Sequence, residues 1–182
     1  LNFLQNTLNV KADRDGVTSG GKVSIKAQLG RSIIDIFIDV GFGNAITPEP
    51  KVAEFPSLLS THKTKPLPKP KIMVYPAETT IAEKLHANVQ FGFFNTRIRD
   101  FFDLYYLFKT QKFDNELVGE AIANSFRRFG SELPDEFDGL SDDFINDKSQ
   151  AWDKYVKNTQ LNFDTPSFQD VVLFIRQHIE EP

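Results

Sequence analysis

The pattern of apolar residues changes near the middle of the chain, and this change limits the possible folds more than any other feature. The first fifty residues contain β-branched, partly alternating segments separated by turn-like residues: NTLNVKA, GKVSIKAQL and RSIIDIFIDVGF. Such segments are typical of β-strands. From Thr79 onward, apolar residues recur at helical spacing, which predicts helices over 79–90, 95–110, 113–130, 141–159 and 165–179. The chain is therefore expected to be an α+β protein, with N-terminal strands followed by a helical C-terminal half.

We place the boundary between these parts at Pro76. Residues 1–76 form the predicted β-rich part, including a connector, THKTKPLPKPK, whose alternating lysines and prolines predict an extended, stiff chain. Residues 77–182 form the predicted helical region. Polar residues that suit a helix N-terminus lie at the expected starts: Thr79 or Thr80, Asn95 or Thr96, Ser141, and Thr165-Pro166.

Composition excludes several classes of protein. The chain has no apolar run near the roughly 18 residues that a membrane span requires, and no basic start followed by an apolar segment, so we expect no membrane partner. The absence of cysteine excludes a disulfide scaffold and a Cys-ligated zinc site, and it is compatible with the cytoplasm. The three histidines are far apart in sequence and lack the spacing of metal ligands.

The third predicted strand carries two acids among apolar residues. One face holds Ile34, Ile36, Ile38 and Val40, whereas Asp35 and Asp39 share the other face with Ile33 and Phe37. A sheet with one solvated face would explain these acids as well as a functional site would.

Charged residues also accompany the apolar positions of the first two predicted helices. Lys84 lies beside the apolar stripe of the first helix, and Asp100 and Asp103 lie together on the polar side of the second, near Arg99. Surface ion pairs and a lysine whose stem covers apolar surface would explain each residue taken alone.

Several short motifs, taken together, form a more specific pattern. They are Asp39 to Gly43, Thr47 to Pro50, Tyr75-Pro76, Ala82-Glu83-Lys84-Leu85, Arg97 or Arg99, and Asp100-Phe101-Phe102-Asp103-Leu104. In this order, between about Gly20 and Leu107, they resemble the AbiEii/AbiGii family of nucleotidyltransferase toxins. The resemblance implies a polymerase-β-like nucleotidyltransferase of a bacterial toxin-antitoxin or phage-defence system, with a cognate antitoxin protein as a partner.

The resemblance also implies a chemistry and roles for named residues. Carboxylate-bound Mg²⁺ would hold the triphosphate of an NTP, and nucleotides would be transferred to an acceptor such as the 3′ end of tRNA. Such a transfer needs carboxylates that bind the metal and a cationic side chain that neutralises the phosphates. By motif, Lys84 would contact the triphosphate. Asp100, with Asp103 as second choice, would be the acid that supports or orients Lys84. Arg97 and Arg99 are candidates for phosphate or acceptor contacts. Asp39, with Asp35 as its companion, is the candidate metal ligand on the sheet.

The chain departs from the family pattern at its beginning. Members begin with a Gly-Ser or Gly-Gly turn followed by an Asp-x-Asp strand that binds the metal. Here Asp13-Arg14-Asp15 precedes Gly20-Gly21 and is expected to be a hairpin loop. We expect either that the metal-binding part precedes Leu1, which the non-Met start favours and which would leave this chain inactive alone, or that this is a degenerate member. The alternative function is a non-catalytic module that binds RNA or a protein through Lys63, Lys65, Lys69 and Lys71.

Overall fold

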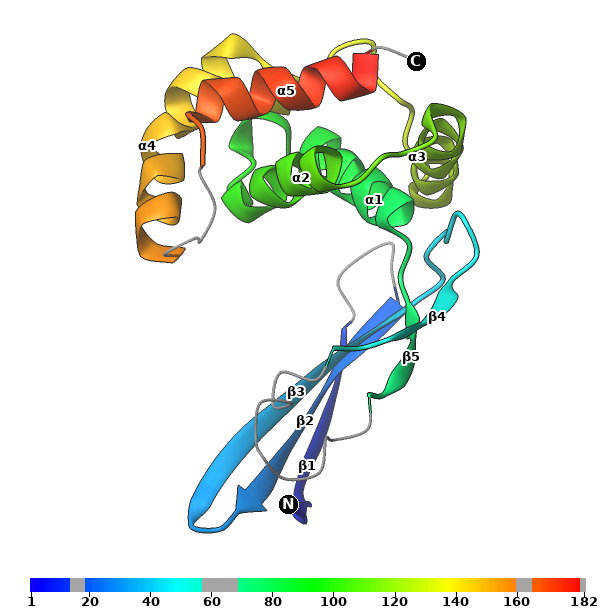
Figure 1. Ribbon diagram of the computed structural model, residues 1–182, viewed down its shortest axis with the longest axis vertical. Helices are drawn as coiled ribbons and strands as arrows, with labels where there is room; N and C mark the ends of the chain where they lie inside the picture. The colour runs from blue at the N-terminus through cyan, green and yellow to red at the C-terminus, as the bar shows by residue number, and fades with distance from the viewer. Residues whose placement is uncertain (14–18, 57–68, 160–164, 181–182) are drawn as a thin grey trace. The chain divides into compact units, whose positions relative to one another are not determined.

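The chain forms two units, each with its own internal contacts. The computed structural model describes residues 1–13, 19–56, 69–159 and 165–180. Contacts divide it into residues 1–44, which are strands, and residues 45–182, which hold a short ribbon and all the described helices (Figure 1). The expected α+β fold, with strands first and helices second, is confirmed.

The first unit is an antiparallel sheet of three long strands in chain order. It contains β1 (Asn2–Asp13), β2 (Ser19–Leu29) and β3 (Ser32–Phe42). Leu29 pairs with Ser32 across a two-residue turn, in which Gly30 has a φ of 61°, a conformation that favours glycine. The loop predicted at residues 13–16 lies, beyond Asp13, outside the described residues.

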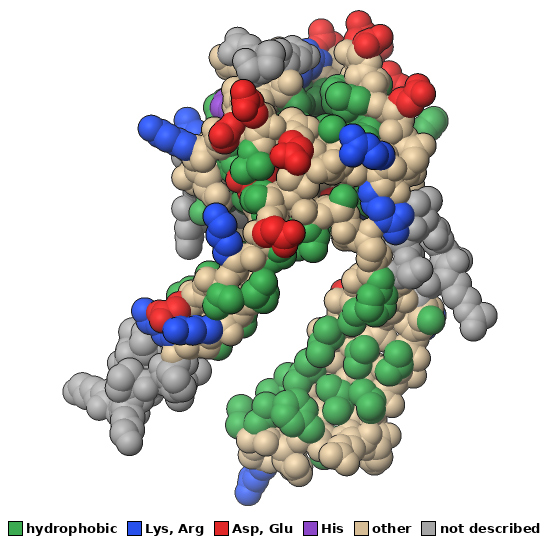
Figure 2. All heavy atoms as spheres, turned by 90° about the vertical axis from the view of Figure 1, so that its right-hand side faces the viewer, with side chains coloured by type: hydrophobic (Ala, Val, Ile, Leu, Met, Phe, Trp, Pro, Cys, Tyr) green, Lys and Arg blue, Asp and Glu red, His purple; other side chains and the backbone are tan. Residues whose placement is uncertain are grey.

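The two faces of this sheet differ in chemistry. Val23, Ile25 and Ala27 pair with Ile38, Ile36 and Ile34, so these six apolar side chains share one face. This face runs along the lower right of Figure 2, where apolar side chains gather. On the opposite face, Lys22 pairs with Asp39 and Lys26 with Asp35. The acids of β3 therefore lie on the polar face.

The second unit begins with a ribbon that our sequence analysis missed. β4 (Lys51–Glu54) and β5 (Lys71–Val74) pair antiparallel, one before the predicted connector and one at its end, where no strand was predicted. Four-residue strands are too short to show an alternating pattern, and the prolines around them favoured a non-strand prediction. Most of the connector, including Lys63 and Lys65, lies outside the described residues.

The helices of the second unit follow the predicted ranges closely. They are α1 (Ala77–Phe91), α2 (Ile98–Thr110), α3 (Asn115–Phe129), α4 (Asp142–Thr159) and α5 (Phe168–Glu180), with 3₁₀ turns at Gly92–Phe94 and Asp138–Leu140. No helix in the described part of the chain is long and apolar enough to cross a membrane.

Several predicted helix starts were wrong, because the polar side chains there have other partners. α1 begins after Pro76, and Thr79 instead hydrogen-bonds to the backbone of Thr47. α2 begins after Arg97, whose backbone N–H donates to the Asn95 side chain in a local turn. α5 begins after Ser167, not at Thr165-Pro166, and the Ser167 hydroxyl accepts from the Asp170 N–H. The predicted start of α4 at Ser141 is confirmed, since its hydroxyl accepts from the Phe144 N–H.

One apolar core joins these helices. It includes Trp152, which is 1% exposed and whose indole N–H donates to the Pro166 carbonyl at 3.0 Å. The fully buried centre is completed by side chains from four helices: Ile81, Leu85, Phe101, Leu104, Phe144, Phe168, Val171, Val172 and Ile175. This core holds α1 and α2 in fixed positions, which decides where their polar faces meet.

Candidate active site

Lys84 lies between two carboxylates from a neighbouring helix. Its ammonium donates to Asp100 Oδ1 at 2.7 Å and to Asp103 Oδ2 at 2.8 Å. All three side chains are partly buried, with exposed fractions of 17% for Lys84, 14% for Asp100 and 29% for Asp103. Two of the three N–H groups of this ammonium are thus directed at carboxylates within the described structure.

Two arginines flank the carboxylates on their outer side. Arg97 Nε lies 2.9 Å from Asp100 Oδ2, whereas Arg99 Nε lies 3.8 Å from Asp103 Oδ2. Their side chains are 55% and 79% exposed, respectively. With one lysine and two arginines against two aspartates, the cluster has a net charge of plus one. The five residues form an alternating chain of charges at the edge of the helical unit.

The local sequence explains why these side chains meet. On α1, Ile81 and Leu85 are fully buried, and Lys84 lies between them in sequence at the border of the apolar stripe. On α2, Asp100 and Asp103 are three residues apart and therefore lie on one face of the helix. Packing of the two apolar stripes brings the border of α1 against this face.

Two other residues of the family motifs, Tyr75 and Thr47, had no role predicted from the sequence and are found to support α1. The Tyr75 hydroxyl donates to Glu83 Oε1 at 2.6 Å, which links the end of β5 to the residue before Lys84. Thr47 exchanges two hydrogen bonds with Thr79, of 2.9 and 2.7 Å, and its hydroxyl accepts from Asn124 of α3 at 2.9 Å. These contacts fix the first turn of α1. The sequence feature that could have indicated these contacts is that Tyr75 and Thr47 both belong to the family motifs.

Asp35 and Asp39 belong to the other unit and have partners there. Asp35 lies 3.5 Å from the ammonium of Lys26, and Asp39 lies 3.4 Å from that of Lys22. Both aspartates are well exposed, at 56% and 78%. These cross-strand ion pairs give the acids a place on a solvated face, which was one of the two explanations left open by the sequence.

Comparison with known proteins identifies the family. The family model described as the nucleotidyl transferase AbiEii toxin of a type IV toxin-antitoxin system matches residues 3–173. The chain belongs to the AbiEii family. The match extends beyond the motifs between Gly20 and Leu107, and it includes β1 and most of the C-terminal helices. Neither a curated protein nor a solved structure matches the chain significantly.

Membership of this family implies an antitoxin as partner and, for the activity, an NTP and a divalent metal. The residues predicted as metal ligands do not fit one ion together. Asp35 and Asp39 are four residues apart on a strand, so their Cα atoms are about 13 Å apart, whereas Mg²⁺ requires ligand oxygens at about 2.1 Å. Within the described residues, no group of three His, Cys, Asp or Glu side chains is placed to hold a metal ion.

Proposed function

We propose that this AbiEii-family chain contributes to a nucleotidyltransferase that moves nucleotides from an NTP to an acceptor such as tRNA. In this proposal Lys84 contacts the triphosphate, Asp100 orients its ammonium, and Asp103 is the second orienting acid. Arg97 and Arg99 are proposed to contact phosphates of the NTP or of the acceptor. The family match supplies the reaction class, and the geometry of Lys84 supports the assignment of roles.

The single observation that carries the proposal is the position of the Lys84 ammonium. A lysine that is 17% exposed and held by two carboxylates has lost most of its freedom before a ligand arrives. Its third N–H group can donate to a phosphate oxygen. A charge held in position in this way costs little reorganisation during phosphoryl-type transfer.

The two arginines suit the larger charge of a triphosphate. One guanidinium group can donate two parallel hydrogen bonds to two oxygens of a phosphate. The side chains of Arg97 and Arg99 are both more than half exposed. Arg99 is the looser of the two, because its contact to Asp103 is 3.8 Å long, whereas Arg97 lies 2.9 Å from Asp100. We therefore expect Arg99 to exchange its carboxylate for a phosphate more readily than Arg97.

The proposed reaction also uses a divalent metal ion. A bound Mg²⁺ would neutralise the triphosphate and position its leaving group. Asp39, with Asp35 second, stays our prediction for a single carboxylate ligand, although the two cannot act together on one ion. The remaining ligands would have to come from groups outside the set of residues named here.

The test is transfer of labelled nucleotide to tRNA by the full-length protein carrying Lys84→Ala. We expect transfer to fall by at least about a hundredfold, the usual effect of removing a group that stabilises transition-state charge. Lys148→Ala is the matched control, because Lys148 is also 17% exposed and also lies 2.7 Å from a carboxylate, that of Asp147. Both variants should unfold cooperatively, as judged by circular dichroism.

Retained transfer in Lys84→Ala would refute the role of this lysine. If the unmodified protein itself transfers no nucleotide in the presence of Mg²⁺, but binds RNA with a steep dependence on salt, the non-catalytic binding module becomes the better description. Neutralising the lysines of the connector should then weaken that binding.

A further inference from the structure

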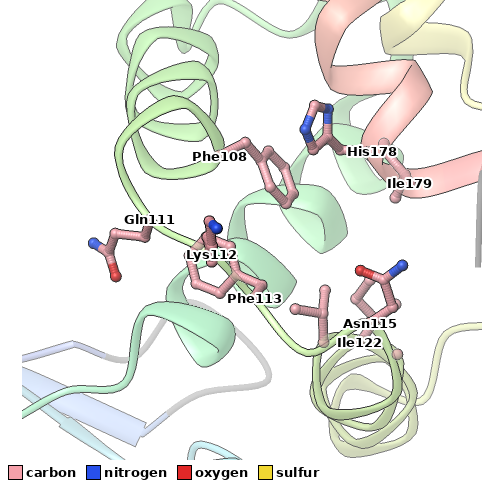
Figure 3. A pocket seen from close by; sticks show the side chains of 10 residues that line it. Phe108, Gln111, Lys112, Phe113, Asn115, Ile122, His178 and Ile179 are labelled. Atoms are coloured by element: carbon pink, nitrogen blue, oxygen red, sulfur yellow. The ribbon is translucent and has the colours of Figure 1, made fainter.

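A pocket of about 440 Å³ opens in the helical unit where three helices end or begin. α2 ends at Thr110, a short extended segment follows, and α3 begins at Asn115, while the last turn of α5 closes the other side. Figure 3 shows His178 and Ile179 of α5 above Asn115 and Ile122 of α3, with Phe108 and Phe113 to the left of them. The pocket shares no residue with the Lys84 cluster.

The apolar part of the pocket wall includes two phenylalanines and several aliphatic side chains. Phe108, Val118 and Ile122 belong to the core and are each less than a tenth exposed. Phe108 and Phe113 meet edge to face with ring centres 5.7 Å apart, and the imidazole of His178 lies 5.0 Å from the Phe108 ring. These contacts hold the rings in place, so the cavity is bounded by fixed surfaces.

The ionisable groups that line the pocket are both bases. Of its ten lining residues, Lys112 and His178 are the ionisable ones, and none is an acid; Gln111 and Asn115 add amide groups. His178 Nδ1 lies 2.8 Å from the Phe174 carbonyl, which can only accept, so this nitrogen carries a proton. Nε2 of the neutral imidazole is then an acceptor, so Lys112 is the group in the lining that can pair with an anion. The lining therefore favours an anionic group.

A glycine keeps one wall of the pocket open. Gly119 lies in the interior of α3, where glycine is less favourable than alanine because it restricts the unfolded chain less. A Cβ atom added at Gly119 would meet nothing within 4 Å, so no close packing requires glycine there. The residue is thus explained better by the space it leaves than by the contacts it makes.

We propose that this pocket binds a small aromatic carboxylate. The ring would lie against Phe108, Phe113 and Ile122, and the carboxylate would pair with Lys112. The volume lies within the range of about 300–1,000 Å³ that is usual for small-molecule sites, and apolar side chains line the pocket together with polar ones, as in such sites. The inference is independent of the proposed transfer reaction.

The test uses 1-naphthoate as probe and 1-naphthalenemethanol as its uncharged counterpart. In the whole chain with labelled isoleucine methyl groups, naphthoate should shift the NMR signals of Ile122 and Ile179 and leave those of Ile33 and Ile38, in the sheet, unchanged. The alcohol should bind about tenfold more weakly, since it lacks the charge-assisted contact. Equal binding of the two probes, or shifts confined to the sheet, would overturn the proposal.

Two pairs of variants locate the probe by calorimetry. Gly119→Leu fills the open wall and should abolish binding, whereas Gly119→Ala should weaken it less. Lys112→Gln should weaken naphthoate about tenfold, whereas Lys109→Gln should not, because Lys109 lies over the Phe174 ring and does not line the pocket. Full binding by a folded Gly119→Leu chain would overturn the site. Lys84→Ala should bind naphthoate normally, so loss of nucleotide transfer in that variant says nothing against the pocket.

Discussion

Replacing Asp100 by asparagine should cost the helical unit clearly more stability than the same replacement at Asp103. Asparagine keeps the shape of the side chain and removes its charge, so the change tests electrostatics with little effect on packing. Asp100 accepts from Lys84 at 2.7 Å and pairs with Arg97 at 2.9 Å, and it is 14% exposed. Asp103 is 29% exposed, and its second partner, Arg99, is 3.8 Å away.

The magnitude follows from the number of close charged contacts and their burial. A hydrogen bond to a charged group contributes about 1.5–3 kcal/mol net. Asp100 loses the charge in two such contacts, but asparagine can still accept one hydrogen bond, so we expect a loss of about 2 kcal/mol. Asp103 loses one close contact at a more exposed site, which predicts about 1 kcal/mol. Asp147→Asn is the control: that side chain is 47% exposed beside Lys148 and should cost at most about 0.5 kcal/mol.

Urea unfolding at neutral pH measures these differences. Trp152 is the only tryptophan and is buried in the helical core, so its fluorescence reports unfolding of this unit. The midpoint should fall most for Asp100→Asn while the slope stays constant, since the surface exposed on unfolding is the same. An equal or larger loss for Asp103→Asn would refute the reasoning that contact length and burial decide the contribution of each acid.

Three further predictions concern a buried histidine of α1 and two glycines, one within α3 and one at its end. His86 is 5% exposed, and burial lowers its pKa below the ordinary value of 6.5, so the folded state disfavours the charged imidazole. The stability that neutral His86 contributes is therefore complete above about pH 6.5 and is lost as the pH falls below that value. Wild type should therefore lose more stability than His86→Phe between pH 7.5 and 5.5 in urea titrations, and parallel losses would contradict this. Gly130 ends α3 with a φ of 67° and has open space around its Cβ position, so Gly130→Ala should destabilise by about 1–2 kcal/mol through backbone strain alone. Gly119→Ala, at a helical position, should instead stabilise the protein. Urea unfolding measures both variants, and a change of the same sign in their free energies of unfolding would contradict this prediction.

Much of the fold was predictable because its signals are local. Along the predicted helix 95–110, apolar residues recur at helical spacing, and the structure buries Ile98, Phe101, Tyr105 and Phe108 while Phe102 packs partly against the core. The three long strands also lie where alternation placed them. Such periodicity depends on residues that are near one another in the chain.

Several errors arose where partners are distant in sequence. Thr79 was expected to cap α1, but Thr47, 32 residues earlier, takes its hydroxyl. The β4–β5 ribbon has too few residues per strand to show a pattern, and its pairing joins segments about twenty residues apart. The naphthoate-sized pocket could not be predicted either, because its walls come from α2, α3 and α5 and only their packing leaves a gap.

For the candidate site, the sequence by itself determined the ingredients: a lysine at the border of one apolar stripe, and two aspartates three residues apart on the polar face of another. Family motifs suggested that these residues act together. Only the tertiary structure decided that Lys84 reaches both carboxylates at once, and that Asp35 and Asp39 pair with Lys26 and Lys22 of the neighbouring strand. The physical reason is that residue patterns specify faces of helices and strands, whereas distances between faces arise from how the apolar sides pack.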